Sequence, residues 1–173
     1  GPGKEGVYTV RASDGGGLTR LTTPPSGIRD IPGDYSTDGT KLVFVRATYA
    51  VLGLGQIWMC NADGTNAHKI TDTLSAYRIS WSRDGRWIVG ERNGALEVID
   101  LQNLGADPRL IEVPNGKATD PRWSPDGSRI VFVYTKTGSS KSQIATVAAD
   151  GSDLVLVTSG SVDGSPDWGF PGF

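Results

Sequence analysis

The sequence has little of what disulfides, zinc sites and membrane spans require. It contains one cysteine and one histidine, which cannot form an internal disulfide or fill the ligand set of a structural zinc site. No apolar run approaches the roughly 20 residues that a membrane-spanning helix needs. With 17 basic and 19 acidic residues the formal net charge is −2. The basic residues are scattered, so no patch for nucleic acid is visible.

Glycine and proline are abundant instead, with 24 and 10 residues, and many stand in a recurring pentapeptide. The chain reads YSTDG at 35–39, WSRDG at 81–85 and WSPDG at 123–127, and a further copy begins at Pro166. The spacing of about 44 residues is typical of the blades of a β-propeller. Helical repeats are excluded because few segments keep a helical period free of glycine and proline.

Each copy is followed by the pattern of a small antiparallel sheet. The Asp-Gly pair favours a tight turn after a first strand. The expected second strands lie at 42–45, 87–89 and 130–134. Their odd and even positions are both apolar, which predicts burial on both faces of the strand. A third strand ends in further Asp-Gly turns, at 63–64 and 150–151, and a more polar fourth strand follows. We therefore predict an all-β protein of four-stranded antiparallel propeller blades.

The repeats suggest a single propeller domain over residues 1–173, with about four blades' worth of chain. Full units are expected at 28–73, 74–115 and 116–160, and partial units at 4–27 and 161–173, the last being one inner strand. That strand could pair with residues 7–10 of the same chain in a four-bladed ring, or of a second chain in an eight-bladed ring. Both arrangements stay open, and light scattering separates them. A partial ring cut from a longer array is the third arrangement, and the exposed edge of its last sheet argues against it.

The pentapeptide at 123–127, the strand and turn from Ile144 to Gly151, and Val157-Thr158 together resemble the WD40-like PD40 repeats of TolB-type β-propellers. The resemblance extends over nearly the whole chain, although TolB-type propellers are larger, with about six blades. It implies a secreted, periplasmic or cell-surface location and contact with other macromolecules. It carries no shared catalytic residue, so it predicts the fold and leaves the activity open.

Residues able to carry chemistry are better explained by structure. His68 precedes an outer strand and is expected on the surface, and Cys60 in an apolar strand behaves as a small hydrophobe. The Asp63-Gly64 pair is predicted to form a turn rather than a calcium site. The inner-strand aromatics are expected to pack between blades: Tyr35, Trp81, Trp123 and Trp168. We therefore expect no catalytic residue, no metal and no cofactor.

One insertion interrupts the repeat. Between the second and third strands, residues 91–94 form a short connection, whereas residues 47–55 of the preceding unit are longer and contain the apolar Tyr49, Val51, Leu52 and Leu54. In an antiparallel blade this loop lies at the same end as the connections between blades. The expected rim of that funnel mouth consists of Arg29, Asp30, Tyr77, Arg78, Asp120 and Arg122. Apolar residues inside a charged rim are typical of a protein-contact site; alternatively, the loop folds back and fills a blade edge.

The leading hypothesis is a non-enzymatic protein-binding or scaffold module that uses the funnel-mouth face. It predicts a protein partner, no nucleic acid and no membrane insertion, and it leaves open a homo-oligomer formed through ring closure. A second hypothesis is the gating propeller of a larger prolyl-oligopeptidase-like hydrolase. A third is a repeat fragment excised to study propeller assembly, since Gly1-Pro2-Gly3 resembles a protease-tag remnant.

Overall fold

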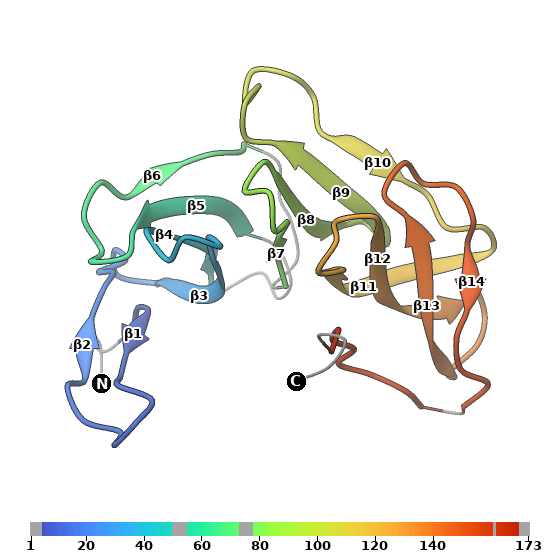
Figure 1. Cartoon of the computed structure of the whole chain (residues 1–173), viewed down its shortest axis with the longest axis horizontal. Helices are drawn as coiled ribbons and strands as arrows, with labels where there is room; N and C mark the ends of the chain where they lie inside the picture. Colours follow the sequence, from blue (N-terminus) through green and yellow to red (C-terminus); the bar gives the residue numbers. More distant parts are fainter. Residues whose placement is uncertain (1–4, 50–54, 73–77, 161, 170–173) are drawn as a thin grey trace. The chain divides into compact units, whose positions relative to one another are not determined.

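Every regular element in the described part of the chain is a β-strand. The computed structural model describes residues 5–49, 55–72, 78–160 and 162–169. Its strands form three four-stranded antiparallel sheets and one two-stranded sheet (Figure 1). The prediction of an all-β chain with four-stranded antiparallel blades is confirmed.

The chain divides into two compact units, Gly1–Tyr77 and Arg78–Phe173. The division falls within a few residues of the boundary expected between the repeat units 28–73 and 74–115. Each unit therefore contains whole sheets, and each is described by itself below. The closure of a ring, within one chain or between two, stays a prediction.

The first unit consists of a hairpin and one full sheet. The hairpin pairs β1 (Tyr8–Thr9) with β2 (Thr19–Arg20). The sheet contains, in sequential order, β3 (Ile28–Tyr35), β4 (Lys41–Thr48), β5 (Gly55–Asn61) and β6 (His68–Lys69). The hairpin corresponds to the two outer strands expected for the partial unit at 4–27.

The second unit contains two full sheets, again with sequential strand order. The first is formed by β7 (Ser80–Trp81), β8 (Trp87–Arg92), β9 (Ala95–Asp100) and β10 (Arg109–Ile111). The second is formed by β11 (Gly116–Trp123), β12 (Arg129–Lys136), β13 (Ser142–Ala148) and β14 (Val155–Leu156).

The end of the second unit differs from the inner strand expected there. Residues 162–169 contain only an isolated parallel bridge between Val162 and Ser142. The indole N–H of Trp168 donates to the carbonyl oxygen of Arg122 at 3.2 Å. The segment thus lies against β11 without forming a strand in the described residues.

The same hydrogen bonds close the first hairpin of every full sheet. In the turn between β11 and β12, Ser124 Oγ donates to Asp126 Oδ1 at 2.6 Å, and the Ser128 N–H donates to the same oxygen at 3.0 Å. Gly127 follows with a φ of 72°, a value that glycine adopts without strain. The other two sheets repeat the serine–aspartate bond, Ser36 with Asp38 and Ser82 with Asp84. The recurring pentapeptide is therefore a turn held by its own side chains.

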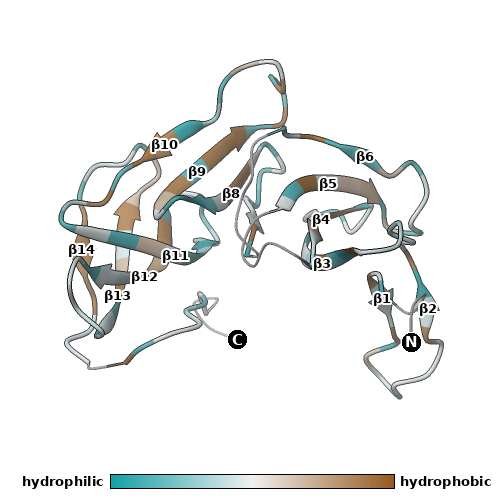
Figure 2. Ribbon diagram, turned by 180° about the vertical axis from the view of Figure 1, so that it is seen from behind, coloured by the Kyte–Doolittle hydropathy of each residue, from teal (hydrophilic) through white to brown (hydrophobic). Residues whose placement is uncertain are grey.

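Apolar faces form the core of each unit. Residues 42–45 and 130–134 are buried at both parities, as predicted. In the second unit one face of the β8–β9 pair packs on β11, β12 and β13 through Leu96, Trp123 and Phe132. In the first unit Val7 and Leu21 of the hairpin segment pack on Leu42 and Phe44. Figure 2 shows the hydrophobic colour concentrated on middle strands such as β9, whereas the outer strand β6 is hydrophilic.

The inner-strand aromatics pack in two of the three full sheets. Trp81 and Trp123 are buried, with 8% and 7% of each residue exposed. The backbone N–H of Trp123 donates to Ser80 Oγ of the neighbouring sheet at 3.3 Å. Tyr35 is 43% exposed, so the packing prediction is wrong for it. The physical reason is that the sheet before it comprises only β1 and β2 in the described residues, which leaves no inner strand to cover Tyr35.

Gly64, in the turn between β5 and β6, allows a close approach to the hairpin segment. Its φ is 86°, and a Cβ there would overlap the carbonyl oxygen of Leu21, whereas Gly39 at φ 69° faces open space. We expect Gly39→Ala to cost only the backbone strain, about 1–2 kcal/mol. Gly64→Ala should lower the free energy of unfolding further, because the hairpin must move. Urea denaturation measures both, and equal losses would contradict the contact.

The turn carboxylates make the stability of the fold depend on pH. Hydrogen bonds from the Ser36 and Ser124 hydroxyls are the main reason that the pKa values of Asp38 and Asp126 are lowered from 3.8 to about 2. The stabilisation is therefore complete above the unfolded-state pKa and is lost as the pH falls through the folded-state pKa. We expect the urea midpoint to fall between about pH 4 and pH 2.

The decline should be smaller in an Asp38→Asn/Asp126→Asn double variant, since neither side chain then titrates. Asp107→Asn, at an exposed position between β9 and β10, is the matched control and should keep the wild-type decline. A double variant with an unchanged pH dependence would show that these turns do not cause it.

Candidate functional site

The structure places six of the ten predicted site residues. Val51, Leu52, Leu54 and Tyr77 lie outside the described residues. The others fall in both compact units: Arg29, Asp30 and Tyr49 in the first, and Arg78, Asp120 and Arg122 in the second.

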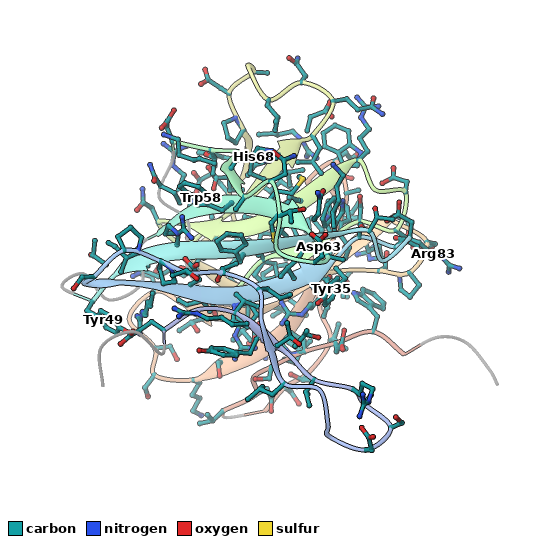
Figure 3. All side chains as sticks on the ribbon, turned by 90° about the vertical axis from the view of Figure 1, so that its left-hand side faces the viewer. Tyr35, Tyr49, Trp58, Asp63, His68 and Arg83 are labelled. Carbon is teal, nitrogen blue, oxygen red and sulfur yellow. The ribbon has the colours of Figure 1, made fainter. Side chains whose placement is uncertain are left out.

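Arg29 and Tyr49 meet where β3 begins and β4 ends. The Tyr49 N–H donates to the carbonyl oxygen of Gly27 at 3.3 Å, which continues the pairing of β3 with β4. The guanidinium carbon of Arg29 lies 5.5 Å from the centroid of the Tyr49 ring, within cation–π range. Tyr49 is 49% exposed. Figure 3 shows it at the opposite end of the sheet from Tyr35 and Asp63.

Asp30 does not lie on an exposed rim, and its prediction as a partner-binding residue is corrected. Arg46 Nε and NH2 donate to its two carboxylate oxygens at 2.7 and 2.8 Å, and none of its side chain is exposed. The guanidinium carbon of Arg46 lies 4.2 Å from the ring centroid of Trp58 and 5.4 Å from that of Phe44. Asp30 is therefore the counter-ion of an arginine that packs on the aromatic face of the sheet.

In the second unit the three predicted residues do come together. Asp120 Oδ1 lies 3.7 Å from Arg78 Nε and 3.6 Å from Arg122 NH1. Asp120 has a φ of 53° and lies where the pairing of β11 with β12 shifts register, between Thr119 and Arg122. Its Oδ1 is buried, with no hydrogen-bond partner among the described residues, so the two guanidinium groups compensate its charge from beyond hydrogen-bond distance. The Arg78 side chain is 56% exposed.

The residues considered for chemistry have the structural roles expected of them. His68 is exposed, and its Nδ1 lies 2.8 Å from the carbonyl oxygen of Asn66. Cys60 is buried, and burial raises the pKa of its thiol. Asp63 Oδ1 accepts from the N–H and hydroxyl of Thr65 at 2.9 and 2.7 Å, as in a turn.

Two searches of the described residues concern metals and membranes. They contain no group of three or more His, Cys, Asp or Glu side chains that could hold a metal ion. They also contain no helix long and apolar enough to cross a membrane.

Sequence reasoning missed a pocket in the second unit, at the end of its sheets where the strands turn after Trp81 and Trp123. It has a volume of about 390 Å³ and lies among the turns at 82–84, 126–127 and 149–150. The sequence pattern indicates only turns at these positions, because each turn is explained by its own hydrogen bonds. The available signal was Arg83, a charged residue at the position where the next repeat has Pro125.

No protein-family model matches the chain. Among curated proteins it is similar to the Tol-Pal system protein TolB of Francisella tularensis subsp. mediasiatica (strain FSC147), with 26% identity over 168 residues, 95% of this chain and 38% of the relative. Among solved structures, TolB from Acinetobacter baumannii matches with a TM-score of 0.71 and 18% identity over 87% of this chain and 37% of that one. The chain has a TolB-like β-propeller fold.

The likeness extends to propellers with other names. An oligogalacturonate lyase from Vibrio parahaemolyticus matches with a TM-score of 0.64 and 16% identity, over 88% of this chain and 46% of that one. An identity this low shows the fold alone. The chain spans little more than a third of the length of the curated TolB relative, 38%. The TolB-like fold is the one that the repeats predicted.

Removal of one partner of the buried Asp30–Arg46 pair should destabilise the first unit. Asp30→Asn leaves the Arg46 charge largely buried without its counter-ion, and we expect the free energy of unfolding to fall by about 3 kcal/mol. The double variant Asp30→Leu/Arg46→Met removes both charges and should recover most of that loss. Urea denaturation followed by tryptophan fluorescence measures both, with Asp34→Asn on the same strand as the control. A single variant no worse than this control would contradict the assignment.

Proposed function

We propose that the chain is a non-enzymatic protein-interaction module that binds a protein partner at the end of the first sheet where Arg29 and Tyr49 meet. The observation that supports this is the half-exposed Tyr49 ring held 5.5 Å from the Arg29 guanidinium carbon. Tyrosine and arginine are enriched in the energetically dominant parts of protein interfaces. A ring already held in place loses less conformational entropy on binding than a free one.

The sequence around this pair fits the same proposal. Val51, Leu52 and Leu54 come within five residues after Tyr49 in the sequence, and apolar residues are what a protein partner buries at the centre of an interface.

The relatives support an assembly rather than an isolated activity. The curated relative is named a Tol-Pal system protein, and we propose a comparable role for this chain, as a component that binds another protein of an assembly. This proposal locates the chain in a secreted, periplasmic or cell-surface setting. An enzymatic role within a larger protein is the alternative, and a hydrolase domain encoded in the same gene would favour it.

Site-specific photo-crosslinking tests the proposed surface. A photoreactive phenylalanine at Tyr49 should give a discrete protein adduct in cells of the native source. The same residue at Tyr35, exposed at the other end of the same sheet, should not. With the partner identified from the adduct, Tyr49→Ala should weaken binding by about 2 kcal/mol, and Tyr35→Ala should leave it unchanged. Equal adduct yields at both positions, or none at Tyr49, would refute the surface.

A further inference from the structure

The outer edge of the last sheet in the second unit lies outside the proposed protein-binding surface. Its end strand is β14, which pairs only with β13 in the described residues (Figure 1). Val155, Leu156 and Val157 follow one another along this edge and are 43%, 50% and 57% exposed. An end strand presents main-chain N–H and C=O groups to which another strand can add.

The other outer strands among the described residues each carry a basic residue. They are β2, β6 and β10, with Arg20, Lys69 and Arg109. A charged side chain on an end strand discourages pairing with another chain, because pairing would desolvate the charge or oppose like charges. β14 consists of Val155 and Leu156 and carries no charge. The feature that discourages pairing at the other outer strands is therefore missing from this one.

Side chains from the same sheet hold β14 in place at both ends. Before its start, Arg129 NH1 and NH2 donate to Oδ2 and to the carbonyl oxygen of Asp153, at 2.7 and 2.8 Å. After its end, Gln143 Nε2 donates to the carbonyl oxygen of Thr158 at 2.7 Å, and the Ile144 N–H donates to Thr158 Oγ1 at 3.0 Å. A strand that is already fixed loses little conformational entropy when a second strand pairs with it.

The main chain of Leu156 is directed away from the sheet. The Val157 N–H donates to the carbonyl oxygen of Ile144 at 2.8 Å, on the side of β13. Successive residues of an antiparallel strand direct their N–H and C=O groups to opposite sides, so those of Leu156 point outward. No further strand pairs with that side of β14 in the described part of the chain. Leu156 is therefore the residue at which a second strand would form its hydrogen bonds.

We propose that this edge pairs with the same edge of a second copy of the chain, antiparallel and about a twofold axis at Leu156. Each Leu156 N–H then donates to the carbonyl oxygen of Leu156 in the other copy. Val155 of one copy lies opposite Val157 of the other, so apolar side chains meet apolar side chains. Asp153 lies opposite Ser159 in this register, so no like charges oppose each other.

The charge pattern of the edge favours a second copy over a strand of different chemistry. The chain carries no charged residue between Asp153 and Asp163, and Arg129 already neutralises Asp153 at 2.7 Å. A charged strand would find no free counter-charge here, whereas the edge itself is an uncharged apolar strand. Because so short an edge buries little area compared with a stable interface, we expect a weak dimer. This pairing is distinct from ring closure, which would use residues 7–10 and 162–169.

Sedimentation of the full chain over a range of concentrations tests the proposal. We expect a reversible monomer–dimer equilibrium. Leu156→Lys places two positive charges opposite each other at the axis and should weaken dimerisation about tenfold. Leu110→Lys is the matched control, at a leucine of the outer strand β10 that is 43% exposed, and should leave dimerisation unchanged. Urea denaturation establishes that each variant is folded.

Leu156→Cys adds a geometric measurement. In the proposed register its two Cα atoms lie about 5.5 Å apart, within disulfide range, so oxidation should give a covalent dimer. Leu110→Cys should not, and the native Cys60 is buried.

Three results would overturn the proposal: a chain that stays monomeric at every concentration, a dimer that Leu156→Lys leaves intact, or equal crosslinking at positions 156 and 110. The second of these would favour ring closure instead. Tyr49→Ala should leave dimerisation unchanged, so the failure of this edge is distinguishable from the failure of the proposed protein-binding surface.

Discussion

The carboxylate of the turn aspartate controls how each full sheet of this protein begins. Asp38, Asp84 and Asp126 each accept a hydrogen bond from the serine two residues before them. The strand that follows is buried at both parities at 42–45 and 130–134. Alternation of apolar and polar residues therefore cannot specify the register there, because a slip by one residue would still bury apolar side chains. The turn fixes the register instead, and the packing of each sheet follows from it.

A second consequence of two buried faces is that any charge within them needs a partner. In the first sheet Asp30 lies opposite Arg46, and in the third Ala118 lies opposite Tyr134 at the corresponding positions. The first sheet satisfies its polar groups with a bidentate ion pair stacked on Trp58. The third uses the Tyr134 hydroxyl, which donates to the carbonyl oxygen of Pro114 at 3.0 Å. The two sheets thus share the same strand pairing at these positions but satisfy their buried polar groups in different ways.

What the sequence could predict is what depends on local spacing. The turns, the apolar second strands and the outer hairpin at β1 and β2 follow from patterns a few residues long, and the structure confirms them. The burial of Asp30 was not predictable in this way, because its partner Arg46 is 16 residues away and the contact depends on the register. The pocket was missed for the same reason: Arg83, Arg109 and Asp150 come from three separate segments, and only the folded sheets bring them together.

The turn also tolerates a change of residue type at one of its positions. The residue between the serine and the aspartate is Thr37, Arg83 or Pro125, yet the serine–aspartate bond stays at 2.6, 2.5 and 2.6 Å. That position can therefore change its chemistry without loss of the turn. Asp84 and Asp126 line the pocket of the second unit while they hold the backbone of their turns. The geometry of the turn therefore depends on the serine and the aspartate, and the chemistry presented at its tip depends on the residue between them.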